Sequence, residues 1–138
     1  MVISRVLHIK TSGDCDIVDI TQDVVKAVSE CGCDSGTVTL FIAGSTAGIT
    51  TIEFETGLVA DLKAAWERIA PRGIGYKHNQ AWGDDNGHSH VRASLLGPSL
   101  VIPFVDKKLA LGTWQQIVVI DFDNRARSRQ IFIQIMGE

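Results

Sequence analysis

Two stretches near the C-terminus decide the fold of this chain, QQIVVIDF at Gln115–Phe122 and QIFIQIM at Gln130–Met136. Both are rich in β-branched and aromatic residues, which are enriched in strands, and the second alternates apolar with polar side chains. The DNRA segment between them, Asp123–Ala126, has the composition of a turn. We therefore predict that the two strands pair as an antiparallel hairpin.

Further strands and two helices are expected upstream, which indicates an α+β domain. One helix is predicted over Gln22–Cys31, capped by Thr21, and another over Gly57–Ala70, whose apolar residues recur at helical spacing. Five more strands are predicted, at Val2–Ile9, Thr37–Ala43, Ala47–Phe54, Ser99–Val105 and Lys108–Leu111. The polar connection Arg72–Gly87 is long for a compact domain, so we expect a functional loop there.

The segment Asn86–Gly97 (NGHSHVRASLLG) gathers two histidines and an arginine and is compatible with either secondary structure. A strand would place four polar side chains on one face: His88, His90, Arg92 and Ser94. A helix would use Asn86 as its cap, turn Val91 and Leu95 to the core, and separate the two histidines by about 200°. We favour the helix, whose first turn would offer free N–H groups to a phosphate.

Length and composition limit the class of protein. A chain of 138 residues fits one domain, residues 1–138, that buries about two-thirds of its unfolded surface. The apolar share of 45% is high for a small monomer, so we expect subunit contacts. A net charge of −3 argues against a nucleic-acid-binding protein, because such a protein needs a basic stripe on its surface. No apolar run is long enough for a signal peptide or a membrane span, and we expect a cytoplasmic protein without a membrane partner.

The three cysteines, Cys15, Cys31 and Cys33, do not form a recognisable metal or redox motif. Cys31-Gly32-Cys33 lacks the second Cys or His pair of a structural zinc site. Gly32 marks a helix end, where the helix dipole raises rather than lowers the pKa of a thiol. We expect free, mostly buried thiols.

Three segments together resemble the YjbQ family, also called UPF0047: Gly44–Glu53 (GSTAGITTIE), Asn86–Pro98 (NGHSHVRASLLGP) and Leu111–Phe122 (LGTWQQIVVIDF). The resemblance covers nearly the whole chain and implies a β-sandwich with packed helices, assembled as a homotrimer. It also implies a weak, secondary thiamine phosphate synthase activity. That reaction joins a pyrimidine diphosphate to a thiazole phosphate and releases pyrophosphate.

The resemblance also implies a set of site residues. The family's polar pattern falls on Glu53, His78, Asn86, His88, His90, Arg92, Ser94, Trp114 and Gln115. His88, His90, Glu53 and Gln115 are the candidate catalytic residues, and the site is expected near a subunit interface where the Glu53 strand meets the His88 segment. Many members carry His-Thr-Ser or His-Thr-Thr where this chain has Gly44-Ser45-Thr46, so one family histidine is missing.

Each of these positions also has an ordinary structural interpretation. Glu53 fits a solvent-facing strand residue, His78 a loop residue, and Trp114 a packing residue. His8 is most simply a structural residue of the first strand. Arg125, Arg127 and Arg129 alternate onto one strand face, which suits a phosphate groove or a solvated or intersubunit face.

Three chemical models fit the candidates. In the first, His78, His88 and His90, with Glu53, hold a zinc-like ion that activates water as in a metal-dependent hydrolase. In the second, a phosphate or diphosphate is bound while a histidine transfers a proton, and Mg²⁺ helps the diphosphate to leave; its binding residues are Ser45, Thr46, Asn86, Arg92 and Ser94. The chain has no Asp-rich diphosphate motif beyond Asp84-Asp85. In the third, the trimer binds a small phosphorylated molecule without catalysis.

Overall fold

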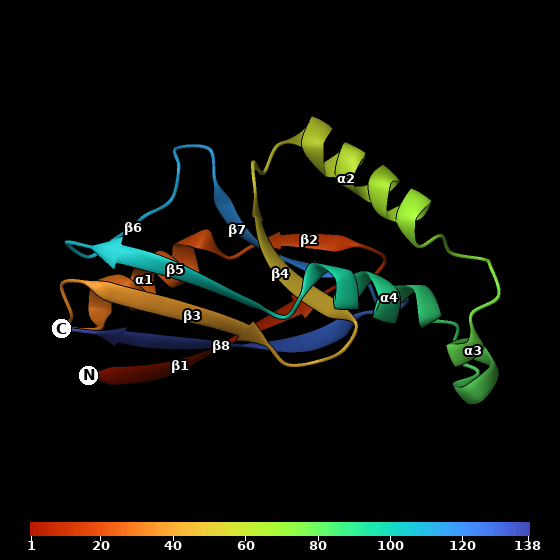
Figure 1. The fold of residues 1–138 in the computed structure, drawn as a ribbon, viewed down its shortest axis with the longest axis horizontal. Coiled ribbons are helices and arrows are strands. Elements are labelled where there is room, and N and C mark those ends of the chain that lie inside the picture. The colour runs from red at the N-terminus through yellow and green to blue at the C-terminus, as the bar shows by residue number, and fades with distance from the viewer.

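The computed structural model describes residues 1–138 and arranges eight strands in two antiparallel sheets (Figure 1). The larger sheet has the order β1-β8-β3-β5-β6, and the smaller sheet has the order β2-β7-β4. The strands of the larger sheet are β1 (Val2–Thr11), β8 (Arg127–Gly137), β3 (Gly36–Ile42), β5 (Ser99–Val105) and β6 (Lys108–Leu109). Those of the smaller sheet are β2 (Asp16–Asp19), β7 (Gln116–Asp121) and β4 (Ala47–Ile52). The predicted α+β class is confirmed.

Four helices complete the fold: α1 (Thr21–Glu30), α2 (Thr56–Ile69), α3 (Lys77–Trp82) and α4 (Gly87–Leu96). Helix α1 adds Val24 and Val28 to the core between the sheets. Helices α2 and α4 add Trp66 and Ala93 to a second core on the other face of the smaller sheet. Helix α3 lies at the end of the molecule farthest from the two termini (Figure 1). None of the helices has the length and apolar character needed to cross a membrane.

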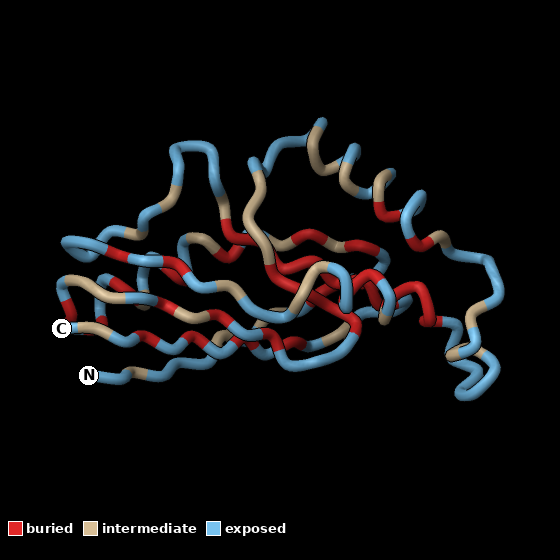
Figure 2. The backbone as a smooth tube through the Cα atoms, viewed as in Figure 1, coloured by how far each residue is buried: buried red, intermediate tan, exposed pale blue.

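Strand β7 is buried on both faces (Figure 2). Ile117 and Val119 enter the core between the sheets, whereas Val118 and Ile120 enter the second core. The predicted hairpin is therefore wrong: β7 pairs with β2 and β4, and β8 pairs with β1 and β3. The continuous apolar run of β7 needs a covering layer on both faces of its sheet. The alternating strand β8 needs a covering layer on one face only, so the two strands belong to different sheets.

Most other predicted elements are present, with small shifts at their ends. The prediction missed β2, which has four residues, and the connection Arg72–Gly87 contains α3. Helix α1 begins at Thr21, but its hydroxyl donates to the Asp19 carboxylate at 2.6 Å instead of capping the helix. The cysteines are free and buried, as predicted, and burial raises the pKa of the Cys15 and Cys33 thiols.

Helix α4 confirms the helical interpretation of residues 88–96, but its polar side faces the core. Val91 and Leu95, predicted to be buried, are 40% and 62% exposed. The inner side of α4 meets main-chain carbonyls of Phe122 and Ala70, which need hydrogen-bond donors. The buried residues of α4 are accordingly Gly87, His88, Ser89, Arg92 and Ala93.

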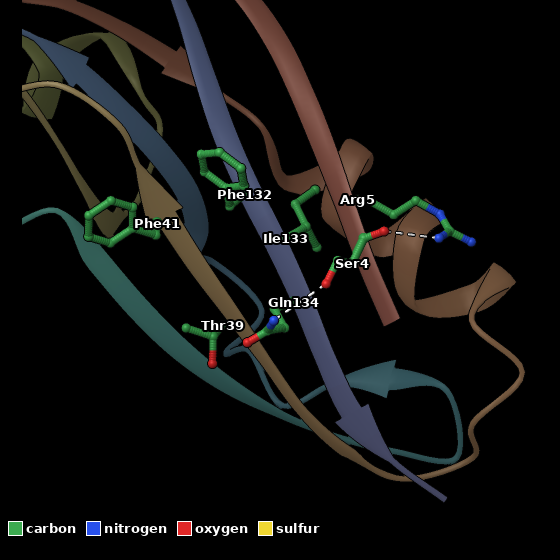
Figure 3. A pocket seen from close by; sticks show the side chains of 7 residues that line it. All are labelled: Ser4, Arg5, Thr39, Phe41, Phe132, Ile133 and Gln134. Atoms are coloured by element: carbon green, nitrogen blue, oxygen red, sulfur yellow. Dashed lines mark hydrogen bonds between the residues drawn. The ribbon is translucent and has the colours of Figure 1, made fainter. Parts of the chain in front are cut away.

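The face of the larger sheet that points away from the smaller sheet is uncovered and carries several exposed apolar side chains among polar ones. Val6, Phe132 and Phe41 lie side by side across β1, β8 and β3 on this face. Figure 3 shows the two phenylalanines among the residues that line a depression. The volume of this depression is about 240 Å³. Seven apolar residues of this outer face are between 43% and 59% exposed: Val2, Val6, Phe41, Val101, Val105, Phe132 and Met136.

Candidate functional site

A cluster of buried charges lies where β7 ends. Asp121 and Asp123 are fully buried, and Arg129 of β8 donates two hydrogen bonds of 2.8 and 2.9 Å to the Asp121 carboxylate. Arg127 donates to Asp123 at 2.7 Å. Burial by itself would raise the pKa of Asp123, but hydrogen bonds from Arg127 and the Asn124 N–H outweigh it and hold that pKa below its usual range. Two carboxylates and two guanidinium groups thus fasten β7 to β8.

This cluster corrects the interpretation of the arginines on β8. Arg127 and Arg129 form neither a solvated face nor an open groove, because each is bound to a buried aspartate. Arg125 precedes β8, lies in the connection and is exposed.

Asn86 connects the charge cluster to two histidines. Its side chain donates to Asp123 at 3.3 Å and makes no cap hydrogen bond to α4. Because the Asn86 amide nitrogen is the donor there, its oxygen accepts from His78 Nε2 at 3.1 Å, and that nitrogen carries a proton. The His78 and His90 rings lie 4.3 Å apart between centroids. Burial and then the neighbouring His78 lower the pKa of His90.

His88 lies on a different side of α4, where it lines a depression of about 380 Å³. The side chain is buried, and burial, followed by the charges of Arg92 and Arg72, lowers the pKa of His88. The imidazole is therefore neutral at pH 7. The depression is lined by Arg72, Gly73, Ile74, Tyr76, Asn79, Asp85, His88 and Asn124.

Hydrogen bonds set the tautomer of His88. The Ser89 hydroxyl donates its only proton to the Phe122 carbonyl. The contact of 3.4 Å between Ser89 Oγ and His88 Nε2 is therefore a hydrogen bond only in the tautomer that carries the proton on Nε2. This arrangement leaves Nδ1 of His88 as a proton acceptor.

Two backbone features contact residues that line the depression. Residues 13–15 are all left-handed, with φ of 77°, 54° and 64°, and two of the three are not glycine. Such strain persists where the surrounding structure holds it, and it is common at functional sites. Asp14 in this loop accepts from Arg72 at 2.9 Å. Gly87 lets α3 and α4 approach, because a Cβ there would lie 2.5 Å from Tyr76 Cβ.

Arg92, expected to bind phosphate, instead joins two helices. It is 2% exposed, and it donates to the carbonyl of Ala70 at 3.0 Å and to Glu67 at 2.8 Å. Hydrogen bonds from the Arg72 N–H and from Arg92 lower the pKa of Glu67. Arg92 therefore completes the C-terminal end of α2, where carbonyl groups lack helical partners.

The other expected phosphate ligands do not share one surface with Arg92. Thr46 is buried between Arg129 and Asp123, with hydrogen bonds of 2.6 and 3.1 Å. Ser94 is exposed and donates to the His90 carbonyl of its own helix. Ser45 is exposed in the connection after β3.

Glu53 and Gln115 lie at the opposite end of the smaller sheet. The ladder between β4 and β7 runs from the pair Ala47 and Asp121 to the pair Ile52 and Gln116, and five strand residues span about 17 Å. Within one chain, the Glu53 strand and the His88 segment therefore do not converge, and their convergence between subunits stays a prediction. Trp114, expected to pack, is 72% exposed at that end.

The structure does not form the expected histidine metal site within one chain. No group of three or more His, Cys, Asp or Glu side chains is arranged to hold a metal ion. His78 and His90 are neighbours, whereas His88 points into its own depression. The residues present in a single chain do not fit a three-histidine zinc ion, and no step of the proposed chemistry depends on one.

The family model described as "UPF0047 protein YjbQ-like" matches residues 5–138. The chain belongs to the UPF0047 family. A UPF0047 protein of Archaeoglobus fulgidus is 36% identical over 130 residues, which cover 94% of this chain and 98% of the relative. YugU of Bacillus subtilis is 30% identical, with 96% and 98% covered. A YbjQ-like protein of unknown function from Sulfolobus solfataricus P2 has the same fold, with a TM-score of 0.95, 34% identity, and 100% and 99% covered.

In this UPF0047 chain, the sequence analysis did not identify several residues of the site. Arg72 and Asn79 lie in an irregular connection and in a short helix, without a spacing pattern. Asp121 and Asp123 flank Phe122 after an apolar run; the sequence analysis places Asp121 in the strand and Asp123 at the start of a turn, and assigns no role to either. A signal was present for the aspartates, because arginines follow at two alternate positions on the next strand.

Proposed function

We propose that this UPF0047 protein binds a small phosphorylated molecule in the depression beside His88, with His88 as a neutral proton acceptor. The observation that carries the proposal is a buried neutral imidazole in the same depression as the Arg72 guanidinium. Such a pair holds an oxyanion and moves a proton. The volume of about 380 Å³ suits one small metabolite.

The donors that face the depression are free for a ligand. The guanidinium group of Arg72 makes one hydrogen bond, from Nη1 to Asp14, and its side chain is 47% exposed. Asn79 accepts from the Gly87 N–H with its oxygen, so its amide nitrogen is available. These groups come from the connection after α2 and from α3, and His88 comes from α4.

Thiamine phosphate synthesis is the specific reaction that the family resemblance implies. Asp85, in the same depression, supports it, because Mg²⁺ in phosphate sites is held by one or two carboxylates together with the phosphates. Bound Mg²⁺ would neutralise the charge of the departing pyrophosphate. The thiazole nitrogen would bond to the pyrimidine methylene carbon as the bond from that carbon to the diphosphate oxygen breaks, which releases no proton. Arg72 would orient the diphosphate, and the neutral His88 would contact the substrate without taking a proton. Formation of pyrophosphate from the two substrates with Mg²⁺, abolished in His88→Asn, is the expected result; equal release by both proteins would refute the role of His88.

We also propose that the protein is a homotrimer that uses the outer face of the larger sheet. This uncovered row of apolar residues is of the kind that marks a protein–protein interface. Light scattering should give three times the chain mass of 15.0 kDa. Phe132→Glu should reduce the mass, and Ile69→Glu, which adds the same charge on the exposed side of α2, should not. A wild-type monomer would refute the assembly.

Calorimetric titration with inorganic phosphate and pyrophosphate tests the binding site. Arg72→Met should weaken binding by about tenfold to a hundredfold, because a hydrogen bond to a charged group contributes about 1.5–3 kcal/mol. Arg68→Met is the matched control, since it removes the same charge from an exposed position of α2 outside the depression. Equal affinity of both variants, or no binding by the wild type, would contradict the proposal.

A further inference from the structure

We infer that the outer side of α4 packs against the outer face of the larger sheet of a second copy of this chain. The inference rests on the proposed homotrimer and names the second surface that such an assembly needs. In a ring of three, each contact joins different surfaces of neighbouring copies, so the sheet face needs a complementary surface on the next chain. We define the outer side of α4 by Val91, Ser94 and Leu95.

The outer side of α4 carries no charged residue, although the solvent side of a surface helix is normally charged or polar. Val91 and Leu95, one helical turn apart, are 40% and 62% exposed, and Ser94 is exposed beside them. The one formally charged residue of the helix, Arg92, is buried on the inner side. The exposed sides of α1 and α2, by contrast, carry both acidic and basic residues. This side of α4 therefore has the composition of a surface that another chain covers.

The outer face of the larger sheet is complementary to this helix in charge as well as in apolar character. The outward positions of β1, β8, β3 and β5 alternate with core positions and carry no carboxylate. Their only formal charge is Lys10, and Lys108 of β6 adds a second positive charge at the opposite edge of the sheet. A face with two lysines and no carboxylate is complemented by a surface that is apolar and bears a carboxylate.

The α4 surface has a carboxylate at the right distance. Asp84 precedes α4 by three residues, and its side chain is 52% exposed. The helical segment 86–95 spans about 14 Å. Lys10 lies opposite Ser128, and the strand segment 128–132 also spans about 14 Å. Leu95 of one chain is therefore able to reach the depression lined by the two phenylalanines of the next chain (Figure 3) while Asp84 approaches Lys10 of that chain.

Light scattering over a dilution series tests this contact. Leu95→Glu should raise the concentration at which half of the trimer dissociates by about tenfold or more, because the new carboxylate has no partner among apolar side chains. Val25→Glu is the matched control, since Val25 is 39% exposed on α1, outside both surfaces, and it should leave that concentration unchanged. Phe132→Lys should weaken the trimer as Leu95→Glu does. The double variant with both changes should regain at least about tenfold, because each contact then joins a carboxylate to an ammonium group.

The outcomes separate this inference from the proposed trimer. A wild type that is monomeric at every concentration overturns both. A trimeric wild type that Leu95→Glu does not weaken overturns the α4 contact and leaves the trimer standing, and so does a double variant that dissociates as readily as Leu95→Glu. Circular dichroism checks the fold of each variant. If Leu95→Glu does not fold, Val91→Glu on the same side of α4 takes its place, and an unweakened trimer then overturns the inference.

Discussion

Replacing Arg92 with Met should destabilise the protein without removing a ligand contact. The guanidinium group is 2% exposed and supplies the only hydrogen bond to the carbonyl of Ala70, a residue that is itself 2% exposed. A buried carbonyl left without a donor costs about 1–3 kcal/mol, and the lost ion pair with the half-exposed Glu67 adds up to about 1 kcal/mol. Because Met keeps most of the packing volume, we expect a loss of about 3 kcal/mol in the free energy of unfolding.

Urea unfolding of Arg92→Met beside Glu67→Gln measures this effect. Glu67→Gln weakens the same pair but leaves the hydrogen bond from Arg92 to Ala70, so it should cost less than about 1 kcal/mol. Calorimetry with phosphate provides the second readout. If Arg92→Met were as stable as Glu67→Gln and had lost phosphate affinity, Arg92 would be a ligand, and its assignment to the end of α2 would be refuted.

Two further predictions concern the histidines and the contact between α3 and α4. The pKa values of His88 and His90 are lowered by folding, so the unfolded chain binds protons first as the pH falls below about 6.5. The free energy of unfolding should therefore decrease from about pH 6.5 downward, and His88→Asn should flatten this dependence; an equal slope in both proteins would contradict the shift. Gly87→Ala should cost about 1–3 kcal/mol by overpacking against Tyr76, whereas Gly75→Ala, with open space around its Cβ, should be nearly neutral in thermal unfolding.

Local signals in the sequence were enough for individual elements. The apolar spacing of α2 and the alternation of β8 depend only on residues near one another in the chain, and both elements were predicted. Strand pairing depends on which layers cover each face, and this information is not local. The apolar run of β7 was therefore recognised as a strand but assigned the wrong partner.

Only part of the candidate site could be predicted from the sequence, for a similar reason. The segment at residues 86–97 does contain the buried His88 and the bridging Asn86. The side of α4 that faces the core was predicted incorrectly, because Val91 and Leu95 are apolar and were expected to be buried. In the structure, unsatisfied carbonyls of neighbouring elements attract Ser89 and Arg92 to the inner side instead. Which carbonyl groups lack a hydrogen-bond donor is decided only when the helices and strands are packed together.

The most direct measurement of the central claim is a crystal structure of the wild-type protein grown with pyrophosphate. The account predicts pyrophosphate in the depression beside His88, with its oxygens within hydrogen-bond distance of the Arg72 guanidinium and the Asn79 amide nitrogen. An empty depression, with pyrophosphate bound only elsewhere in the protein, would contradict it.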